Sequence, residues 1–263
     1  MAGIEPGLWS LEKGNKGVAE AFLDNSKASL LKAAVKSVSL IKDELGTSYE
    51  IEYQKGEETN SREYDIVIIA TPLETSKNKI SLVDFPLNVA PFAQPLHKLV
   101  AMFTQGRINA SMFGKTVADF PDLLTISSEV FFNSIGKLTP VDPDSKPDKE
   151  LPTDHAVWKT FLNQVPLKEQ IDSLFDEYED LRLVDWLAYP DYKPGMDLPP
   201  FMLYDRLYYV NAIESAASAM EMSVIGAKNV ALLAFNQWHG NYDKIDETSL
   251  PDVSKDSETK SEL

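Results

Sequence analysis

The hydrophobic and polar positions of residues 29–73 follow the patterns of β-strands. Tyr49–Gln54 alternates as a half-buried strand does, and Lys55–Glu58 has the glycine and charged residues of a hairpin turn. Tyr64–Leu73 is a nearly continuous apolar, β-branched run, which predicts a buried strand that ends at Ala70-Thr71-Pro72. Upstream, Ser29–Leu40 fits either another strand or a short helix.

The C-terminal part of the pattern predicts a strand, a polar turn and a long helix. Leu207–Val210 is the apolar strand, and almost every side chain is short in Ala216–Ser223 and then in Gly226-Ala227. Small side chains let another molecule approach the N–H groups and positive dipole end of a helix, where a flavin or a phosphate binds well. They equally suit a helix packed tightly on a sheet, and the segment alone leaves both interpretations open.

The middle of the chain, Ile80–Pro200, is less regular and rich in proline. Leu99–Thr104 and Val157–Phe161 are predicted strands of a mixed or antiparallel sheet. Leu167–Tyr178 has the apolar spacing of an amphipathic helix. Thr139–Asp154 lacks apolar periodicity and is expected to form a mobile surface loop.

Composition excludes several classes of function. With 43% hydrophobic residues, 263 residues can build one large domain or two small ones, and no apolar run is long enough for a transmembrane span. A net charge of −16 argues against nucleic acid as a partner and would repel anionic lipid. The absence of cysteine excludes disulfides, a thiol nucleophile and thiolate metal sites.

Other chemistry finds little support in the residues. The three histidines His97, His155 and His239 have no ligand spacing, so no metal site is predicted. There is no Gly-x-Ser-x-Gly motif for a hydrolase. The acidic run Asp176–Asp180 is typical of the solvated face of a helix, so no catalytic acid, base or nucleophile is predicted.

Several motifs carry a family resemblance. The predicted strand that ends in Ala70-Thr71-Pro72 resembles the strand exit of flavoprotein oxidases of the amine-oxidase type, and the helix Ala219–Ala231 resembles their closing flavin motif. The chain as a whole resembles the prenylcysteine oxidase family. The motifs that carry this resemblance are Gly7-Leu8-Trp9-Ser10 with Gly14-Asn15-Lys16, Asn133-Ser134-Ile135-Gly136, Trp186-Leu187-Ala188-Tyr189-Pro190 with Tyr192-Lys193-Pro194, and Asp205-Arg206-Leu207-Tyr208-Tyr209.

One departure from the family pattern is the lack of a G-x-G-x-x-G turn, since the two glycines of Lys13–Val18 have the wrong spacing. The resemblance therefore implies an α/β (α+β) fold class: the C-terminal part of an FAD/NAD(P)-binding flavoprotein oxidase fold with a mixed-sheet substrate domain, lacking the N-terminal glycine-rich βαβ unit. Met1–Pro6 does not have the pattern of a secretory signal, so a truncated isoform or a partial gene model is expected.

The resemblance also implies a division of the chain. Residues 1–79 would be part of the FAD-binding domain, and residues 80–200 the substrate-binding domain. Residues 201–238 would supply the closing FAD-binding strand and helix, and residues 239–263 an acidic C-terminal tail. Most of this tail, from about Asp243, is expected to be disordered.

The implied function is that of an FAD-dependent thioether oxidase. Such an enzyme cleaves farnesyl- or geranylgeranylcysteine with dioxygen and water to a prenyl aldehyde, cysteine and hydrogen peroxide, during breakdown of prenylated proteins. The alternative is a truncated, inactive isoform without flavin, which would act as a lipid- or protein-binding module. A relative of the monoamine or polyamine oxidases would need an aromatic cage or an acidic amine pocket, which the sequence does not reveal.

The resemblance assigns cofactor contacts by position, and ordinary core packing is the alternative for each. Val35 would meet the adenine, Ala70 and Thr71 would line the strand exit, and Asn211 would contact pyrophosphate or ribitol. Backbone groups of Met220, Glu221 and Met222 would face the pyrimidine end of the flavin and stabilise negative charge there. Glu214 and Glu221 are also typical of capping or salt-bridge residues.

The substrate would be held mainly by apolar walls, because a prenyl chain offers no polar group. The candidate lining residues are Trp186, Tyr189, Tyr192, Met202, Tyr204 and Tyr208. Arg206 would either bind the substrate carboxylate or pair structurally with Asp205.

The resemblance implies a lysosomal or secretory-pathway protein. Asn109-Ala110-Ser111 would then be a glycosylation site, although an unused chance match is the alternative. Lys260-Ser261-Glu262-Leu263 differs at one position from an endoplasmic-reticulum retention signal.

Overall fold

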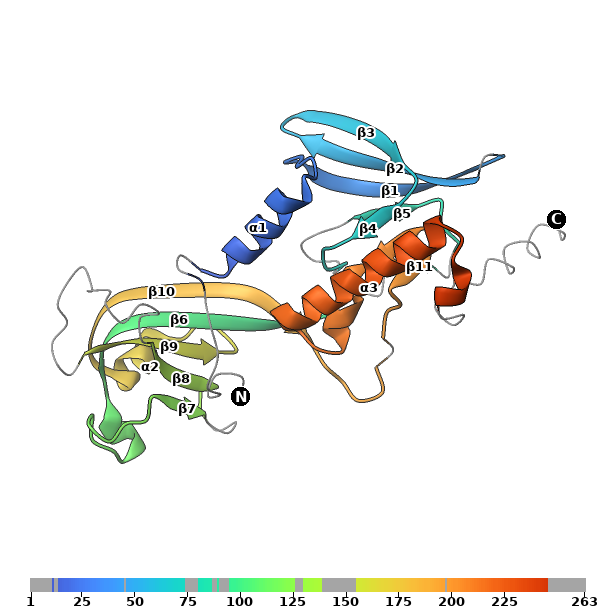
Figure 1. Ribbon diagram of the computed structural model, residues 1–263. Helices are drawn as coiled ribbons and strands as arrows, with labels where there is room; N and C mark the ends of the chain where they lie inside the picture. Colours follow the sequence, from blue (N-terminus) through green and yellow to red (C-terminus); the bar gives the residue numbers. More distant parts are fainter. Residues whose placement is uncertain are drawn as a thin grey trace, which may run out of the picture. The chain divides into compact units, whose positions relative to one another are not determined.

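The chain forms a mixed α/β fold, as predicted, with two compact units (Figure 1). The computed structural model describes residues 11, 14–44, 46–73, 80–86, 89, 95–125, 130–138, 155–196 and 198–245. The first unit consists of Met1–Leu30 and Lys98–Ala188, and the second of Leu31–His97 and Tyr189–Leu263. The domain boundaries drawn from the sequence, and the roles assigned to those segments, stay predictions.

A five-stranded sheet forms the first unit, in the order β10-β6-β9-β8-β7. The five strands are β6 (Leu96–Ile108), β7 (Leu123–Thr125), β8 (Ser134–Leu138), β9 (Ala156–Leu162) and β10 (Phe175–Pro190). β6 and β9 confirm the two predicted strands and pair antiparallel, with Val100 opposite Leu162 and Gly106 opposite Ala156. Helix α1 (Lys16–Ser26) also belongs to this unit.

Buried and half-buried residues alternate strictly along β9, so one face of this sheet lies against a core. Trp158 and Leu162 are buried, together with Val100 and Met102 of β6, and they pack with Ile171. Ile171 lies on the short helix α2 (Lys168–Leu174), and the 3-10 turn η1 (Ala110–Phe113) adds Ala110. The indole Nε1 of Trp158 donates a hydrogen bond of 3.2 Å to the carbonyl of Gly106, so this large side chain buries no unpaired donor.

The predicted amphipathic helix Leu167–Tyr178 is wrong at its C-terminal end. α2 stops at Leu174, and Phe175 is already extended, with φ −129° and ψ 130°. Pairing with β6 overrides the helical pattern, because Gly106 has no side chain to obstruct the backbone of Glu177 and Tyr178. Phe175 and Tyr178 reach the core from a strand as they would from a helix.

The second unit contains a four-stranded sheet in the order β3-β2-β1-β5. Its strands are β1 (Ala34–Asp43), β2 (Gly46–Lys55), β3 (Glu58–Tyr64) and β5 (Ser81–Val83). The predicted hairpin turn between β2 and β3 is confirmed, and Gly56 there has φ +65°, which favours glycine. β1 shows that the segment after Ser29 contains a strand, and it runs antiparallel to β2 and parallel to β5.

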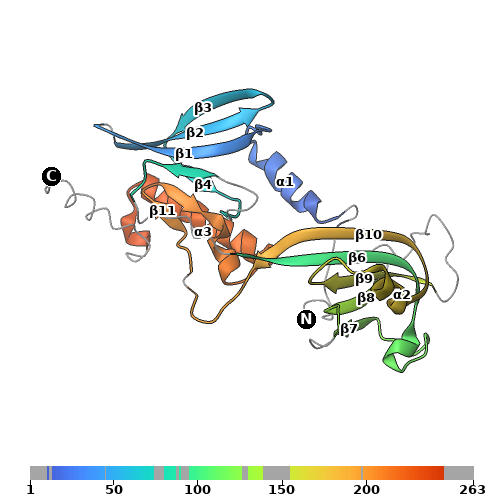
Figure 2. The same ribbon diagram turned by 180° about the vertical axis from the view of Figure 1, so that it is seen from behind.

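A three-stranded sheet, in the order β11-β12-β4, completes the second unit with helix α3. β4 (Val67–Ile69) and β12 (Leu207–Tyr209) run parallel, while β11 (Met202–Tyr204) runs antiparallel to β12. α3 (Met220–Trp238) lies along β11 in both views (Figure 1, Figure 2). Val230, Leu233 and Ala234 of α3 pack with Met202 and Tyr208 in one core cluster.

The prediction of one long buried strand at Tyr64–Leu73 is wrong in its extent. Tyr64 ends β3 in one sheet, and only Val67–Ile69 form β4 in the other. Within the described residues β4 is an edge strand that pairs with β12 alone, which is why Ile68 remains 46% exposed despite its apolar character.

The helix predicted from Ala219 begins at Met220, so the small residues Ala216–Ser218 precede it. Val210–Ser215 form the 3-10 turn η2, Ala219 is extended, and regular helix begins at Met220. The expected disorder from Asp243 is wrong for the first residues of the tail, because η3 (Tyr242–Lys244) leads to Ile245, which is 5% exposed and joins the core cluster of α3.

Two predictions fall outside the described residues: the loop Thr139–Asp154 and the tail beyond Ile245. Among the helices that the structure describes, none has both the length and the apolar character needed to cross a membrane.

Candidate functional site

The candidate site lies in the second unit, where two parallel strands end. Because β4 and β12 are parallel neighbours, Ala70 and Thr71 leave the sheet at the same edge as Val210 and Asn211. Ala70 is exposed and Thr71 is half-buried. Ligands of α/β sheets bind preferentially at such carboxyl ends. The structure thus brings together three of the residues predicted to contact a cofactor, Ala70, Thr71 and Asn211.

A polar cluster occupies the turn η2 that follows β12. The side-chain amide of Asn211 donates a hydrogen bond of 3.1 Å to Oε1 of Glu214. Burial raises the pKa of the Glu214 carboxyl, and the hydrogen bond from Asn211 opposes that shift. The backbone carbonyl of Glu214 accepts a 2.8 Å hydrogen bond from the Tyr192 hydroxyl. Glu214 is therefore an integral part of this turn.

Tyr209 connects the turn η2 to the exit of β4. Its hydroxyl accepts a hydrogen bond of 3.4 Å from the backbone N–H of Leu73. Burial raises the pKa of this hydroxyl, the bond from Leu73 opposes the shift, and the charge of Glu214 adds to it. Tyr209 and Glu214 were not predicted as site residues, because their desolvation depends on tertiary packing.

The N-terminus of α3 follows η2 directly. Met220, Glu221 and Met222 form its first turn, where they were expected. A helix leaves the N–H groups of its first turn without helical acceptors, and Ala219 at the N-cap has no side chain able to satisfy them. The carboxylate of Glu221 lies near the positive end of the helix dipole. This end of α3 can stabilise negative charge.

A hollow of about 360 Å³ lies beside the segment that joins η2 to α3. Its walls are Tyr189, Tyr192, Ala216, Ala217 and Ser218. The ring of Tyr189 stacks on that of Tyr192, with centroids 6.1 Å apart and an interplanar angle of 13°. The hollow thus has an aromatic wall facing small side chains.

The aromatic wall is held in place from both sides. The ring of His97 stacks on Tyr189 at 5.3 Å and 14°. Burial raises the pKa of the Tyr192 hydroxyl, and a backbone hydrogen bond from Ser218 opposes the shift. Tyr189 and Tyr192, two of the predicted substrate-lining residues, therefore lie together in a defined arrangement.

The other predicted lining residues lie elsewhere. Tyr204 is 4% exposed and meets the ring of Phe85 edge to face at 5.8 Å. Tyr208 is fully buried, and its hydroxyl donates to Oε1 of Gln237. Met202 is also buried, and Trp186 lies half-buried on β10 in the first unit. Val35, the predicted adenine contact, is 39% exposed on β1 of the four-stranded sheet.

Arg206 makes the structural contacts that were the alternative to substrate binding. Its Nε lies 3.5 Å from Oδ2 of Asp205, and its Nη2 donates to the carbonyl of Thr47. The other carboxylate oxygen of Asp205 accepts a 2.9 Å hydrogen bond from Gln237. Arg206 has φ +58°, an uncommon conformation for a residue with a side chain, in the tight turn between β11 and β12.

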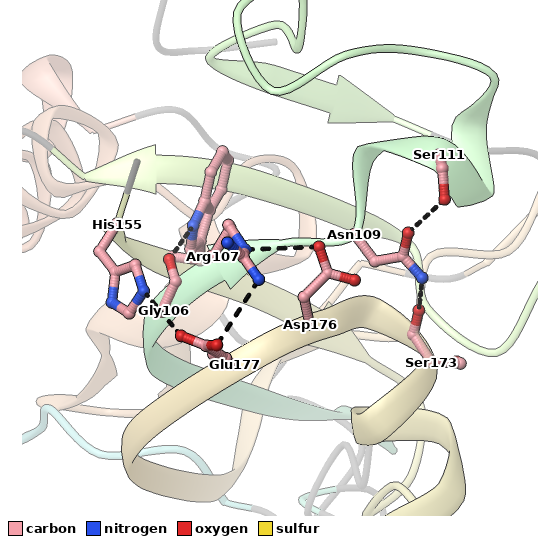
Figure 3. A network of polar contacts seen from close by, with 9 residues as sticks. Gly106, Arg107, Asn109, Ser111, His155, Ser173, Asp176 and Glu177 are labelled. Atoms are coloured by element: carbon pink, nitrogen blue, oxygen red, sulfur yellow. Dashed lines mark hydrogen bonds and ion pairs between the residues drawn. The ribbon is translucent and has the colours of Figure 1, made fainter. Parts of the chain in front are cut away.

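The predicted glycosylation site is part of a polar network in the first unit (Figure 3). The side-chain amide of Asn109 donates a 3.1 Å hydrogen bond to the carbonyl of Ser173, and Ser111 Oγ donates to Asn109 Oδ1 at 2.6 Å. Asn109 is half-buried. In this folded form its amide nitrogen is therefore engaged with the chain itself.

The acidic run Asp176–Asp180 lies on strand β10 and not on a helix as predicted. Arg107 Nε is 3.5 Å from Asp176 Oδ2, and Arg107 Nη2 is 3.6 Å from Glu177 Oε1. His155 Nε2 lies 3.6 Å from the other oxygen of Glu177 (Figure 3). Among the residues that the structure describes, no group of three or more His, Asp and Glu side chains is placed to hold a metal ion.

Comparison with known proteins covers nearly the whole chain. Residues 1–247 match the model of the family described as prenylcysteine lyase. Prenylcysteine oxidase 1 of Bos taurus is 39% identical over 259 residues, which cover 95% of this chain and 51% of that protein. The Homo sapiens protein of the same name is 40% identical, and prenylcysteine oxidase 1-like of Bos taurus is 35% identical. The chain spans about half the length of these curated relatives.

Proposed function

The chain belongs to the prenylcysteine lyase family, and we propose that it forms part of an FAD-dependent thioether oxidase. The proposed substrate is farnesyl- or geranylgeranylcysteine, which reacts with dioxygen and water to give a prenyl aldehyde, cysteine and hydrogen peroxide. The relatives named prenylcysteine oxidase 1 support this assignment. When bound, FAD would supply the acceptor for the hydride that leaves the prenyl carbon next to sulfur.

The parallel pairing of β4 and β12 is the observation that carries the proposal. It juxtaposes Ala70 and Thr71 with Asn211 at one sheet edge, and α3 begins shortly after Asn211. The small side chain of Ala70 would let a cofactor approach the backbone closely. The N-terminal turn of α3 would stabilise negative charge on a bound group. Val35 is the proposed adenine contact.

The hollow beside η2 is the proposed place for apolar parts of the substrate in the second unit. The stacked rings of Tyr189 and Tyr192 offer an apolar wall, and Ala216 and Ala217 leave room in front of it. Burial of prenyl carbons contributes about 0.8 kcal/mol per methylene before ordering costs. Such a wall would hold and orient the prenyl chain and exclude water from it.

The first experiment is a cofactor-binding test on the purified chain. The protein is incubated with excess FAD, free cofactor is removed, and the visible spectrum of the protein fraction is recorded. Retained absorption at roughly 370 and 450 nm, the usual flavin bands, is the expected result. Peroxide release on addition of S-farnesylcysteine then tests the reaction. A colourless protein that releases no peroxide contradicts an activity of this chain alone.

A pair of matched variants tests the location of the cofactor. Ala70→Glu places a negative charge at the exposed strand exit, where it should repel a pyrophosphate and abolish retained flavin. Ala21→Glu makes the same change at an exposed position of α1, in the first unit, and should retain flavin. Equal flavin content in the two variants would argue against binding at the ends of β4 and β12.

A lysosomal or secretory-pathway location, with a glycan on Asn109, is part of the same proposal. Since the amide nitrogen of Asn109 donates to Ser173 in the folded chain, the glycan would have to be attached before this contact forms. Mass spectrometry of the chain expressed through the secretory route measures the modification, and an unmodified Asn109 would contradict it.

The second candidate function is a flavin-free module that binds lipid or protein. It is favoured by one observation, the outer stripe of α3, which we define as Met220, Val224, Ala227, Ala231, Phe235 and Trp238. These residues recur at helical spacing, all are exposed, and the four large side chains are 50–57% exposed. Retained flavin with peroxide release supports the enzyme. A colourless protein whose outer stripe binds apolar ligands supports the module.

A further inference from the structure

A hollow of about 300 Å³ lies at the C-terminal end of α3, and we call it the charged hollow. Its walls are Asp205, Arg206, Gln237, Trp238 and Tyr242, all of which belong to the second unit. The first two form the turn between β11 and β12, the next two end α3, and the last begins η3. Its volume corresponds to about ten water molecules, which is enough room for a ligand of about ten non-hydrogen atoms.

The charged hollow is separate from the proposed cofactor site, although both lie in the second unit. Asp205 and Arg206 precede β12, whereas Asn211 follows it, so β12 lies between the two sites. They also lie at opposite ends of α3, whose 19 residues make it about 28 Å long. A ligand of the charged hollow is therefore a second ligand, distinct from the cofactor.

Two opposite charges line the charged hollow side by side. Nε of Arg206 lies 3.5 Å from Oδ2 of Asp205, and the two side chains are 21% and 31% exposed, respectively. A guanidinium has five N–H donors, and a carboxylate has about four acceptor positions. Both groups can thus bind a ligand in addition to each other, and a ligand that matches them carries a negative and a positive group close together.

Neighbouring groups hold both charges in place. Nε2 of Gln237 donates a 2.9 Å hydrogen bond to Oδ1 of Asp205, and Oε1 of the same amide accepts from the Tyr208 hydroxyl. Nη2 of Arg206 donates to the carbonyl of Thr47 on β2. With φ +58°, Arg206 has a left-handed conformation that is unfavourable for a residue with a side chain, and such conformations cluster at ligand-binding turns. The two charges therefore form a preorganised pair.

Aromatic rings supply the apolar part of the charged hollow. Trp238 and Tyr242 line it and remain 52% and 54% exposed. Such rings can cover a short apolar chain on the ligand. A free α-amino acid with an apolar side chain has the three required parts, since its amino group is protonated and its carboxyl group ionised at neutral pH.

We propose that the charged hollow binds a free apolar α-amino acid, with its ammonium group on Asp205 and its carboxylate on Arg206. Trp238 and Tyr242 cover the side chain of this ligand. A simple anion or cation would meet a group of like charge in the hollow, whereas a zwitterion pairs with both groups. This site goes beyond the proposed function and does not depend on flavin.

Isothermal titration calorimetry of the full chain, without added FAD, tests the proposal with L-leucine and L-phenylalanine as probes. Two modified forms of leucine each lack one charge: N-acetyl-L-leucine has no ammonium group, and L-leucinamide has no carboxylate. Each should bind about tenfold or more weakly than L-leucine, the usual effect of losing a charged hydrogen bond. Because these forms resemble the two ends of a peptide, the comparison also distinguishes a free amino acid from a peptide terminus.

Two variants assign the charges to their partners. Asp205→Asn keeps an oxygen that can accept from Gln237 but removes the negative charge. It should weaken binding of L-leucine about tenfold or more, without weakening that of N-acetyl-L-leucine. Arg206→Gln should weaken binding of L-leucine by a similar factor, without weakening that of L-leucinamide. A general loss of structure would not give this crosswise pattern.

Trp238→Ala tests the apolar wall and is matched by Phe235→Ala. Both positions are exposed aromatic residues of α3, but only Trp238 lines the charged hollow. Trp238→Ala should weaken binding of L-leucine several-fold, and Phe235→Ala should leave it unchanged. Circular dichroism confirms that each variant is folded, and Asp205→Asn and Trp238→Ala still decide the outcome if Arg206→Gln does not fold.

Three outcomes overturn the inference. The first is that the unmodified chain shows no saturable binding of either amino acid. The second is that L-leucine binds no more tightly than its acetylated and amidated forms. The third is that Asp205→Asn and the unmodified chain have equal affinity for L-leucine.

Discussion

Glu214 is a carboxyl group that the fold partly withdraws from water. Its pKa is raised by burial, against the opposing hydrogen bond from Asn211. The folded chain therefore binds the proton of Glu214 more tightly than the unfolded chain does. The associated stability is fully present below the unfolded pKa and is lost as the pH rises through the higher folded pKa. At neutral pH the partly buried, charged Glu214 therefore lowers the stability of the folded chain.

The variant Glu214→Gln should remove this pH dependence. Glutamine keeps an oxygen to accept from Asn211 but has no charge to desolvate, so the Tm at pH 7 should rise above that of the unmodified chain. The difference should shrink towards about pH 4, the usual range of a glutamate. Thermal unfolding at several pH values measures this.

Glu221→Gln is the control, since it removes a carboxylate from the favourable first turn of α3. It should lower the unfolding free energy by about 0.3–1 kcal/mol at pH 7. If both variants change the Tm in the same direction, burial does not control the stability effect of Glu214.

Single residues also explain which parts of the candidate site could be predicted. Ala70, Thr71 and Asn211 were placed by resemblance, and the parallel pairing of β4 with β12 juxtaposes them. Tyr204 and Tyr208 were predicted to line a pocket but are core residues, because a tyrosine on a strand suits either place and only the neighbouring elements decide. Glu214 was not predicted as a site residue for the same reason, because its burial depends on the neighbouring elements.

Close packing between β6 and β10 depends on one glycine. A Cβ on Gly106 would lie 2.3 Å from the carbonyl oxygen of Glu177 and 2.8 Å from the Cα of Tyr178. Gly106→Ala should therefore force the two backbones apart and lower the unfolding free energy by about 3 kcal/mol or more. Urea denaturation measures the loss.

A glycine with open surroundings gives the comparison. Gly114 has φ +66° and nothing near the position of a Cβ. Gly114→Ala should therefore lower the unfolding free energy by only about 1 kcal/mol, because alanine disfavours the left-handed conformation. Losses of similar size for Gly106→Ala and Gly114→Ala would mean that β10 moves easily away from β6.

The contact between α3 and η2 depends on Gly226. A Cβ there would lie 2.9 Å and 3.0 Å from two atoms of Ile213. Gly226→Ala gains about 1 kcal/mol of helix propensity but creates this overlap, so a net loss of about 1 kcal/mol is expected. In chemical denaturation, the double variant Gly226→Ala with Ile213→Ala should lose less than the sum of the single losses. Strict additivity would show that the two residues do not interact.

The elements show why local patterns predicted only part of the fold. The hairpin at Lys55–Glu58 joins neighbours in sequence, so turn chemistry and alternation were sufficient to predict it. β4 pairs with a strand far away in sequence, and the local pattern could not reveal that the apolar run Tyr64–Leu73 is divided between two sheets. In Leu167–Tyr178, pairing with β6 outweighed helical periodicity.

At the scale of the whole molecule, the outer stripe of α3 departs from an ordinary helix surface. A helix with a buried apolar face and a second apolar stripe is usual when both sides are covered. In this chain alone, Val224 and Phe235 of the stripe are 51% and 57% exposed. Exposed apolar surface of this kind promotes association.

The double variant Val224→Gln with Phe235→Gln should reduce association of the purified chain and its binding of a hydrophobic dye. Because both side chains are exposed, the unfolding free energy should change by no more than about 0.5 kcal/mol per site. Leu233→Gln, at a buried position of the same helix, should instead lower it by about 2 kcal/mol or more. Unchanged self-association in light scattering would argue against the outer stripe as its cause.

Each unit is assembled from two separate stretches of chain, and this determines when it can fold during synthesis. The long second stretch of the first unit ends at Ala188, whereas the second unit needs everything up to Ile245, which is buried against α3. As the ribosome extends the chain, the first unit can close while β4 still lacks its partner strand β12, and while the core of Val38, Tyr49 and Ile69 still lacks Leu207 and Tyr209. Between these two points of synthesis, a nascent chain would expose the apolar residues of this incomplete core, and a chaperone would have most to protect in that period.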